Sequence, residues 1–149
     1  MPLSDKEYLQ LNQALFTLTH AYESRMSKGD PRNILDLKLS DCSVLMVLSQ
    51  FEPVNSRDLS RIMDINPGTI SVYVQRLVKK ELVIKLQDEE DRRNWWLTLT
   101  QLGQTAAQGV LAGAVEYTRE FLAALNDDEQ KTLHGLLLKA SHSLGFEWQ

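Results

Sequence analysis

Apolar residues recur at helical spacing near the start of the chain. Positions three or four residues apart are apolar: Tyr8, Leu11, Leu15, Leu18, Tyr22 and Met26. This spacing predicts one long amphipathic helix. Ser4 and Glu7 have the spacing of a capping box at its start. Gly29 and Pro31 are expected to end it.

The middle of the chain carries three shorter helical patterns. The first has Ser40 as its expected cap and is broken at Pro53-Val54, and a short helix then begins at Asn55. Residues 64–66 are expected to turn the chain into a helix opened by Pro67, whose missing N–H costs nothing at that position. At about 100° per residue, the inward stripe of this helix is Ile70, Val74, Leu77 and Val78. Its outward positions are Gly68, Thr69, Ser71, Val72, Gln75, Arg76 and Lys79.

Residues 84–99 show the pattern of a β-hairpin. Residues 84–87 alternate apolar with polar, residues 95–99 are rich in aromatic and β-branched side chains, and the segment 88–94 between them is entirely polar. Arg92 and Arg93 lie at the expected tip of this hairpin. The order helix, turn, helix, hairpin predicts a winged helix-turn-helix, an arrangement that enters DNA grooves.

The remaining sequence predicts two further helices. Thr100 can cap a helix that reaches about Leu125, and Asn126 can cap the last one. Both terminal helical regions have more apolar surface than a small winged module covers, which predicts an isologous homodimer. The expected fold is therefore mainly α with a small β-wing (α+β). It comprises a winged helix-turn-helix over residues 31–100 and a helical dimerisation region built from both termini, residues 1–30 and 101–149.

Composition and charge narrow the class of protein. The chain has 149 residues, of which 43% are hydrophobic and 24% charged, and no apolar run is long enough to span a bilayer. With no secretory signal and a single cysteine, Cys42, we expect a cytoplasmic protein. The net charge is −4, but residues 55–93 carry eight basic and seven acidic side chains. This weak polarisation predicts modest, salt-sensitive binding to a nucleic acid.

One motif in the hairpin has a specific spacing. Residues 91–93, Asp-Arg-Arg, are followed by Leu99-Thr100 and then Gly103. This run resembles the wing motif Asp-x-Arg and the downstream Leu-Thr-x-x-Gly of the MarR family of bacterial and archaeal transcription regulators. Other positions also resemble the family, so that the likeness covers nearly the whole chain: Leu39-Ser40, Val47-Leu48, Asp127-Asp128-Glu129 and Leu136-Leu137. Glu81 departs from the pattern, because the family has glycine there, and we expect the preceding helix to end without the left-handed glycine cap.

The resemblance implies a DNA-binding transcription regulator, most simply a repressor that a small effector releases. It implies an obligate homodimer whose terminal helices interlock and whose recognition helices enter successive major grooves about 34 Å apart. It also implies an effector, often aromatic or phenolic, bound between the dimerisation region and the winged domain. We place this cavity between the first helix, the second helix and the start of helix 101–125, with Phe16, Tyr22 and Val44 as its lining.

The DNA-contacting side chains are expected on the wing and on the recognition helix. Arg93 suits the minor groove, with Asp91 holding its side chain by a charge-assisted hydrogen bond, and Arg92 contacts phosphate or lies in solvent. On the helix, hydrogen bonds to bases or phosphates are expected from Thr69, Ser71 and Gln75. Val72 suits a thymine methyl and Arg76 a guanine or a phosphate. Lys79 completes this outward face.

Other interpretations of these residues remain open. A winged-helix module that binds proteins and has lost DNA binding is the main alternative, and it is consistent with the acidic total charge. Trp95 and Trp96 point to opposite faces of a strand, so at most one of them packs inward. Cys42 is expected to be a passive thiol, the three histidines lack the spacing of a metal site, and we expect neither a cofactor nor an enzymatic activity.

Overall fold

The computed structural model describes residues 1–27 and 35–145, and these residues form two compact units. The first unit, Met1–Leu39, contains helix α1 (Asp5–Ser27). The expected capping box is present at the start of α1, since the Ser4 hydroxyl and backbone N–H both donate to the Glu7 carboxylate at 2.7 and 2.8 Å. The expected end of this helix at Gly29 and Pro31 lies outside the described residues.

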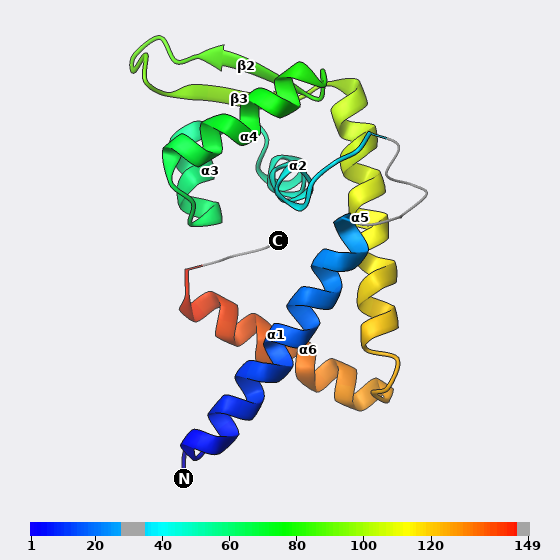
Figure 1. The fold of residues 1–149 in the computed structure, drawn as a ribbon. Coiled ribbons are helices and arrows are strands. Elements are labelled where there is room, and N and C mark those ends of the chain that lie inside the picture. The colour runs from blue at the N-terminus through cyan, green and yellow to red at the C-terminus, as the bar shows by residue number, and fades with distance from the viewer. Residues whose placement is uncertain (28–34, 146–149) are drawn as a thin grey trace. The chain divides into compact units, whose positions relative to one another are not determined.

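The second unit, Ser40–Gln149, holds the remaining elements, drawn in Figure 1. They are α2 (Leu39–Phe51), β1 (Val54–Asn55), α3 (Ser56–Met63), α4 (Pro67–Lys79), β2 (Val83–Gln87), β3 (Trp95–Leu99), α5 (Gln101–Phe121) and α6 (Asp127–Ser143). The three strands form one antiparallel sheet in the order β1-β3-β2. The predicted class, mainly α with a small β-wing, is confirmed. No helix in the described part of the chain is both long and apolar enough to cross a membrane.

Local signals position the helices of this unit. The Asn55 side chain accepts the N–H of Asp58 at 2.7 Å and starts α3, and the Thr100 hydroxyl accepts the N–H of Gly103 at 2.9 Å and starts α5. Pro67 occupies the first turn of α4, as predicted. Because the two caps join residues three apart and Pro67 acts at its own position, all three helix starts follow from the sequence.

The core lies where α2, α3, α4 and the sheet meet. The following side chains there have no accessible surface: Val44, Leu45, Leu48, Leu59, Leu77, Leu82 and Leu97. In β3 the buried Leu97 and Leu99 share a face with Trp95, whereas Trp96 points the other way and is 39% exposed. The prediction that at most one tryptophan packs inward is therefore confirmed.

Four details differ from the sequence prediction. Strand β1 pairs with β3 through Val54, which was expected only to break a helix. Val78 is 37% exposed, so the inward stripe of α4 ends at Leu77. Helix α2 already begins at Leu39 rather than after a cap at Ser40, and α5 ends at Phe121 rather than near residue 125.

The end of α4 differs from expectation in an informative way. Glu81 adopts a left-handed conformation, with φ of 61°, although it is not glycine. Its N–H donates to the Val78 carbonyl at 2.9 Å, and the N–H of Leu82 donates to the Leu77 carbonyl at 2.9 Å. These two bonds form a Schellman motif. The left-handed cap that we expected to be lost with the glycine is therefore retained by a glutamate.

Candidate nucleic-acid interface

Helix α4 presents a polar face to solvent. Ser71, Val72, Gln75 and Lys79 are exposed as predicted, and Thr69 is half-buried. The helix is capped by Asn66, whose side chain accepts the N–H groups of the second and third residues of α4, at 2.8 and 3.3 Å. The exposed side chains can therefore offer hydroxyl, amide, methyl and ammonium groups to a ligand along one side of α4.

Arg76 does not belong to this exposed face. Its Nε and Nη2 atoms donate to the Asp41 carboxylate at 3.1 and 2.8 Å, and Nη2 also donates to the Ser40 hydroxyl at 2.8 Å. The Arg76 side chain is 28% exposed. The periodicity of α4 alone predicts an outward position for Arg76, whereas the carboxylate that holds it comes from α2. In this structure the Arg76 guanidinium forms an internal ion pair with Asp41 and does not extend into solvent.

The wing is ordered by short-range hydrogen bonds to Asp88 and Asp91. One Asp88 oxygen accepts the N–H groups of Glu90 and Asp91 at 2.9 and 3.3 Å, and these bonds, the first above all, lower the pKa of the Asp88 carboxyl. The other oxygen of Asp88 accepts the indole N–H of Trp96 at 3.1 Å. The loop between β2 and β3 is therefore closed by an ionised carboxylate rather than by a tight glycine turn.

Asp91 holds Arg93 differently from the prediction. One oxygen of Asp91 accepts the backbone N–H of Arg93 at 3.1 Å, and the other pairs with the Arg57 guanidinium of α3 at 2.5 Å. Asp91 thus fixes the main chain of Arg93 and leaves its guanidinium exposed, with no ion pair to any described residue. Arg92 is exposed as well, and its carbonyl accepts the Gln87 side-chain amide at 2.9 Å.

Sequence reasoning missed the residues that attach the wing to α3. Asn94 is 6% exposed, and its side-chain oxygen accepts the Ser56 hydroxyl at 2.8 Å and the N–H of Arg57 at 3.2 Å. The Ser56 oxygen in turn accepts the N–H of Trp95 at 3.1 Å. A polar residue in a polar run gives no sign that it is buried, so the sequence contains no signal for Asn94.

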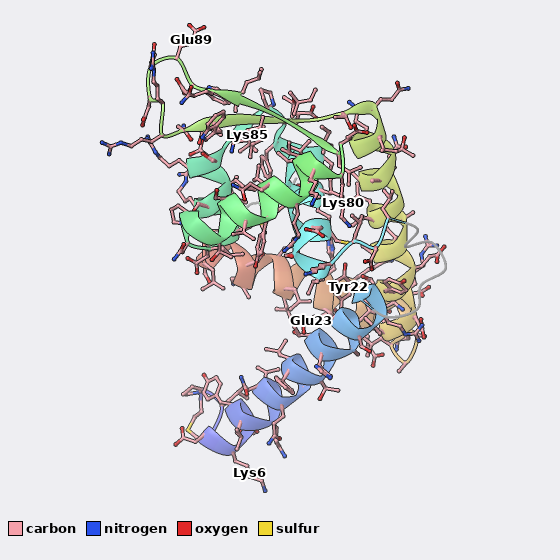
Figure 2. All side chains as sticks on the ribbon, turned by 45° about the horizontal axis from the view of Figure 1, so that its top comes forward. Lys6, Tyr22, Glu23, Lys80, Lys85 and Glu89 are labelled. Atoms are coloured by element: carbon pink, nitrogen blue, oxygen red, sulfur yellow. The ribbon has the colours of Figure 1, made fainter. Side chains whose placement is uncertain are left out.

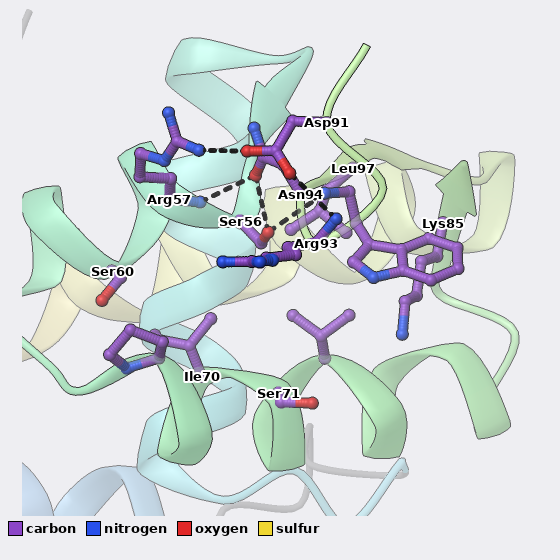
Figure 3. A pocket seen from close by; sticks show the side chains of 13 residues that line it. Ser56, Arg57, Ser60, Ile70, Ser71, Lys85, Asp91, Arg93, Asn94 and Leu97 are labelled. Carbon is purple, nitrogen blue, oxygen red and sulfur yellow. Dashed lines mark hydrogen bonds and ion pairs between the residues drawn. The ribbon is translucent and has the colours of Figure 1, made fainter. Parts of the chain in front are cut away.

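An open cleft separates the wing from α4 (Figure 3). Its volume is about 350 Å³. Arg93 and Lys85 line it from the hairpin, Ser71 lines it from α4, and Trp95 lies beside them. The Lys85 ammonium is 4.2 Å from the centre of the Trp95 ring, a cation–π contact. Figure 2 shows Glu89 at the loop end of the hairpin, away from Lys85. Of the charged residues that line the cleft, Lys85, Arg93 and Arg57 are basic and Asp91 is acidic.

The predicted effector residues lie in different units. Phe16 belongs to α1, where it is 69% exposed and stacks on His20 with ring centres 6.0 Å apart. Tyr22 is half-buried in the same helix. Val44 has no accessible surface in α2. Their use as a common cavity lining stays a prediction, and the open cleft lies elsewhere, beside the wing.

Cys42 is buried at 4% exposure on α2. Burial, with a smaller contribution from the neighbouring Asp41 carboxylate, raises the pKa of its thiol to about 11. A thiol in this state is a weak nucleophile at neutral pH. Residues 1–27 and 35–145 contain no group of three or more side chains arranged to hold a metal ion.

Comparisons with known proteins point to one family. The MarR family model matches residues 37–95. The HTH-type transcriptional regulator SarZ of Staphylococcus aureus is 28% identical over 86 residues, which are 58% of this chain and 58% of SarZ. The match thus spans little more than half the length of that relative.

Two solved structures have the same fold. A mutant MarR from E. coli in complex with operator DNA superposes with a TM-score of 0.76 at 20% identity, over 93% of this chain and 99% of that one. BpsR of Bordetella bronchiseptica, whose DNA binding is described as regulated by 6-hydroxynicotinic acid, gives 0.76 at 23% identity, over 89% and 98%. These two likenesses show a shared fold, and the MarR family model matches less than half of the chain, so that the chain is similar to the MarR family over residues 37–95.

Proposed function

We propose that this protein is a sequence-specific DNA-binding transcription regulator. The observation that carries the proposal is that the exposed face of α4 and the Arg93 guanidinium, which forms no ion pair with a described residue, lie across one open cleft. A helix of this kind fits the major groove, and an arginine on the adjacent wing reaches the minor groove of the same duplex. The fold shared with a MarR bound to operator DNA supports this arrangement.

The regulator acts as a homodimer in this proposal. Helix α6 has no buried side chain within the chain, and Leu136 on it is 60% exposed. Helix α1 likewise leaves Leu11, Leu15 and Leu18 exposed. Apolar surface of this extent is typical of a protein interface. A dimerisation region built from residues 1–30 and 101–149 would place two winged domains, residues 31–100, on one pseudo-palindromic operator.

Repression relieved by a small aromatic or phenolic effector completes the proposal. Support comes from BpsR, whose DNA binding is described as regulated by 6-hydroxynicotinic acid. Phe16, Tyr22 and Val44 are the side chains that we propose to line the effector cavity. The regulator would act in the cytoplasm, with no cofactor and no catalytic step.

Arg93→Ala tests the DNA-binding role, with Arg92→Ala as the matched control. The probe is a duplex that the wild type selects from a random-sequence pool. Arg93→Ala should weaken binding at least about tenfold, because one minor-groove cation is lost from each subunit. It should also reduce the magnitude of the slope of log affinity against log salt concentration by up to about 2 per dimer.

Folding and dimerisation should be unchanged in both variants, because both side chains are exposed. Arg92→Ala removes the same charge one residue away and should have a smaller effect. If Arg93→Ala binds as tightly as the wild type across a salt series, the wing arginine does not contact DNA. If the wild type selects no duplex from the pool, the proposed function is wrong, and a winged module that binds proteins is the better interpretation.

A further inference from the structure

Arg76 is the most strongly held side chain of α4. Its guanidinium donates to one Asp41 oxygen through both Nε and Nη2, at 3.1 and 2.8 Å, and to the Ser40 hydroxyl at 2.8 Å. The ring of Tyr73, one turn earlier on α4, lies 5.2 Å from the guanidinium carbon. The cation is thus fixed from two helices at once, by the first turn of α2 and by its own helix.

The pair is costly to bury. The Asp41 side chain is 1% exposed, so its carboxylate has exchanged water for Arg76 and its remaining neighbours. Desolvation of two charges often cancels their attraction, and apolar residues of similar size commonly stabilise a fold as well or better. Fold stability alone therefore does not explain why an ion pair occupies this position.

Hydrogen bonds differ from apolar contacts in being directional. Apolar side chains let two packed helices roll or slide with little change in energy. The hydrogen bonds of a guanidinium to a carboxylate instead weaken when their donor–acceptor distances change by more than a few tenths of an ångström. Because Arg76 is on α4 and its acceptors are on α2, the hydrogen bonds of the Arg76 guanidinium fix the rotation of α4 about its own axis. Ser71, Val72 and Gln75 on the exposed face turn with it.

We infer that Arg76 is a positioning residue, which through Asp41 sets the rotation of α4 and thereby the operator preference of the protein. The inference rests on the proposed DNA-binding function. The tips of side chains lie about 5–6 Å from a helix axis. A roll of roughly 20° would therefore move them by about 2 Å, which is enough to break a hydrogen bond to a base edge.

The test compares Asp41→Ala, Arg76→Met and the double variant. The double variant removes one charge of each sign, so its net charge equals that of the wild type. Lys79→Met is the control, because Lys79 is an exposed cation on the same helix. Each protein is titrated over a salt series with the wild-type-selected duplex and with an unrelated duplex of the same length and composition. Thermal unfolding by circular dichroism reports the fold.

We expect the double variant to lose about tenfold or more in affinity for the selected duplex and less than about twofold for the unrelated one. Its salt dependence should match that of the wild type, because no phosphate contact is lost. Lys79→Met should instead weaken binding to both duplexes alike. A double variant that keeps the wild-type ratio of the two affinities would overturn the inference.

Asp41→Ala separates positioning from direct contact. If Arg76 itself bound DNA, freeing it from Asp41 would preserve or raise the affinity for the selected duplex. If Arg76 positions α4, Asp41→Ala lowers that affinity severalfold although the buried Asp41 cannot reach DNA. Wild-type or tighter binding by Asp41→Ala therefore overturns the inference.

A readout without DNA separates this inference from the proposed function. If the wild type selects no duplex from the pool, the proposed function is wrong. Amide hydrogen exchange then still tests the Arg76–Asp41 ion pair. Exchange of residues 73–79 should be at least about tenfold slower in the wild type than in the double variant. Equal exchange in the two proteins would contradict the positioning role itself.

Discussion

The backbone carbonyl oxygen of Leu82 lies 1.9 Å from the position that a Cβ atom on Gly103 would occupy. This oxygen cannot move aside easily, because it accepts the N–H of Thr100 at 3.0 Å, while the N–H of Leu82 is bonded to the Leu77 carbonyl. The first turn of α5 therefore packs directly on the main chain that leaves α4. Only glycine permits this approach, which explains the last position of the Leu-Thr-x-x-Gly motif.

Gly103→Ala should lower the free energy of unfolding by about 3 kcal/mol or more, since the added methyl group forces a backbone shift. Urea denaturation measures the change. Gly109→Ala is the control on the same helix, because a Cβ there meets no atom within 4 Å of the chain. This control should stabilise α5 by about 0.5–1 kcal/mol. Similar stabilities of the two variants would contradict the steric explanation.

Signals between near neighbours explain why so much of the fold was predictable. Asn55, Thr100 and Asn126 each cap a helix through a hydrogen bond to a residue three positions later. The alternation in residues 84–87 and 95–99 likewise reflects one local property of a strand. Each of these features can be evaluated within a short window of sequence.

The features that sequence reasoning missed depend on distant partners. Asn94 bonds to Ser56, 38 positions away, and Arg76 bonds to Asp41, 35 positions away. Neither partner can be identified from helical or strand periodicity, because both partners belong to other elements. For this reason the exposed wing arginine was placed correctly, whereas Arg76 was assigned to the outer face of α4.

Glu81→Gly should stabilise the protein by about 1 kcal/mol. Glu81 occupies a left-handed conformation, with φ of 61°, which costs a residue with a Cβ atom roughly that much relative to glycine. Glu81→Ala is the control, because it removes the carboxylate but keeps the Cβ atom. Thermal or urea unfolding should rank Glu81→Gly above both Glu81→Ala and the wild type. Equal stability of the two variants would show that the backbone conformation carries no cost.

Ser56→Ala and Asn94→Ala should act on one shared interaction. Each variant breaks the bond of 2.8 Å that joins α3 to the wing and leaves buried polar groups unpaired, so each should cost about 1–3 kcal/mol. The double variant should cost clearly less than the sum, with a coupling of about 1 kcal/mol. Additive losses in urea denaturation would mean that the two side chains act independently. DNA affinity should fall in each variant as well, since the wing would lose its hydrogen bond to α3 although its charge is unchanged.

The Cys42 thiol should make the protein less stable in alkali. Its pKa is raised to about 11 in the folded state from 9.0, so the unfolded chain loses this proton first. The contribution of this thiol to the free energy of unfolding is fully present below about pH 9. It falls by roughly 2 kcal/mol as the pH rises toward 11. Cys42→Ala should flatten this part of the curve of stability against pH. The native thiol should also react about 100-fold more slowly than free cysteine with a thiol reagent at neutral pH.

Dimerisation should depend on both ends of the chain. Leu136 and Leu137 lie on α6, which buries no side chain within the chain, so a partner surface is needed to remove them from water. Replacing both by glutamate should weaken the dimer about 100-fold or more while circular dichroism shows an intact fold. Lys131→Glu on the same helix is the control for added negative charge.

Sedimentation at micromolar concentration distinguishes the outcomes. The wild type and Lys131→Glu should sediment as dimers, and the glutamate double variant as a monomer. A chain lacking residues 1–28 should also lose tight dimerisation, because it lacks the exposed apolar side chains of α1, including Leu11 and Leu15. A folded wild-type monomer would contradict the dimer outright. Tight dimerisation by the shortened chain would restrict the interface to the C-terminal helices and remove the N-terminal helix from it.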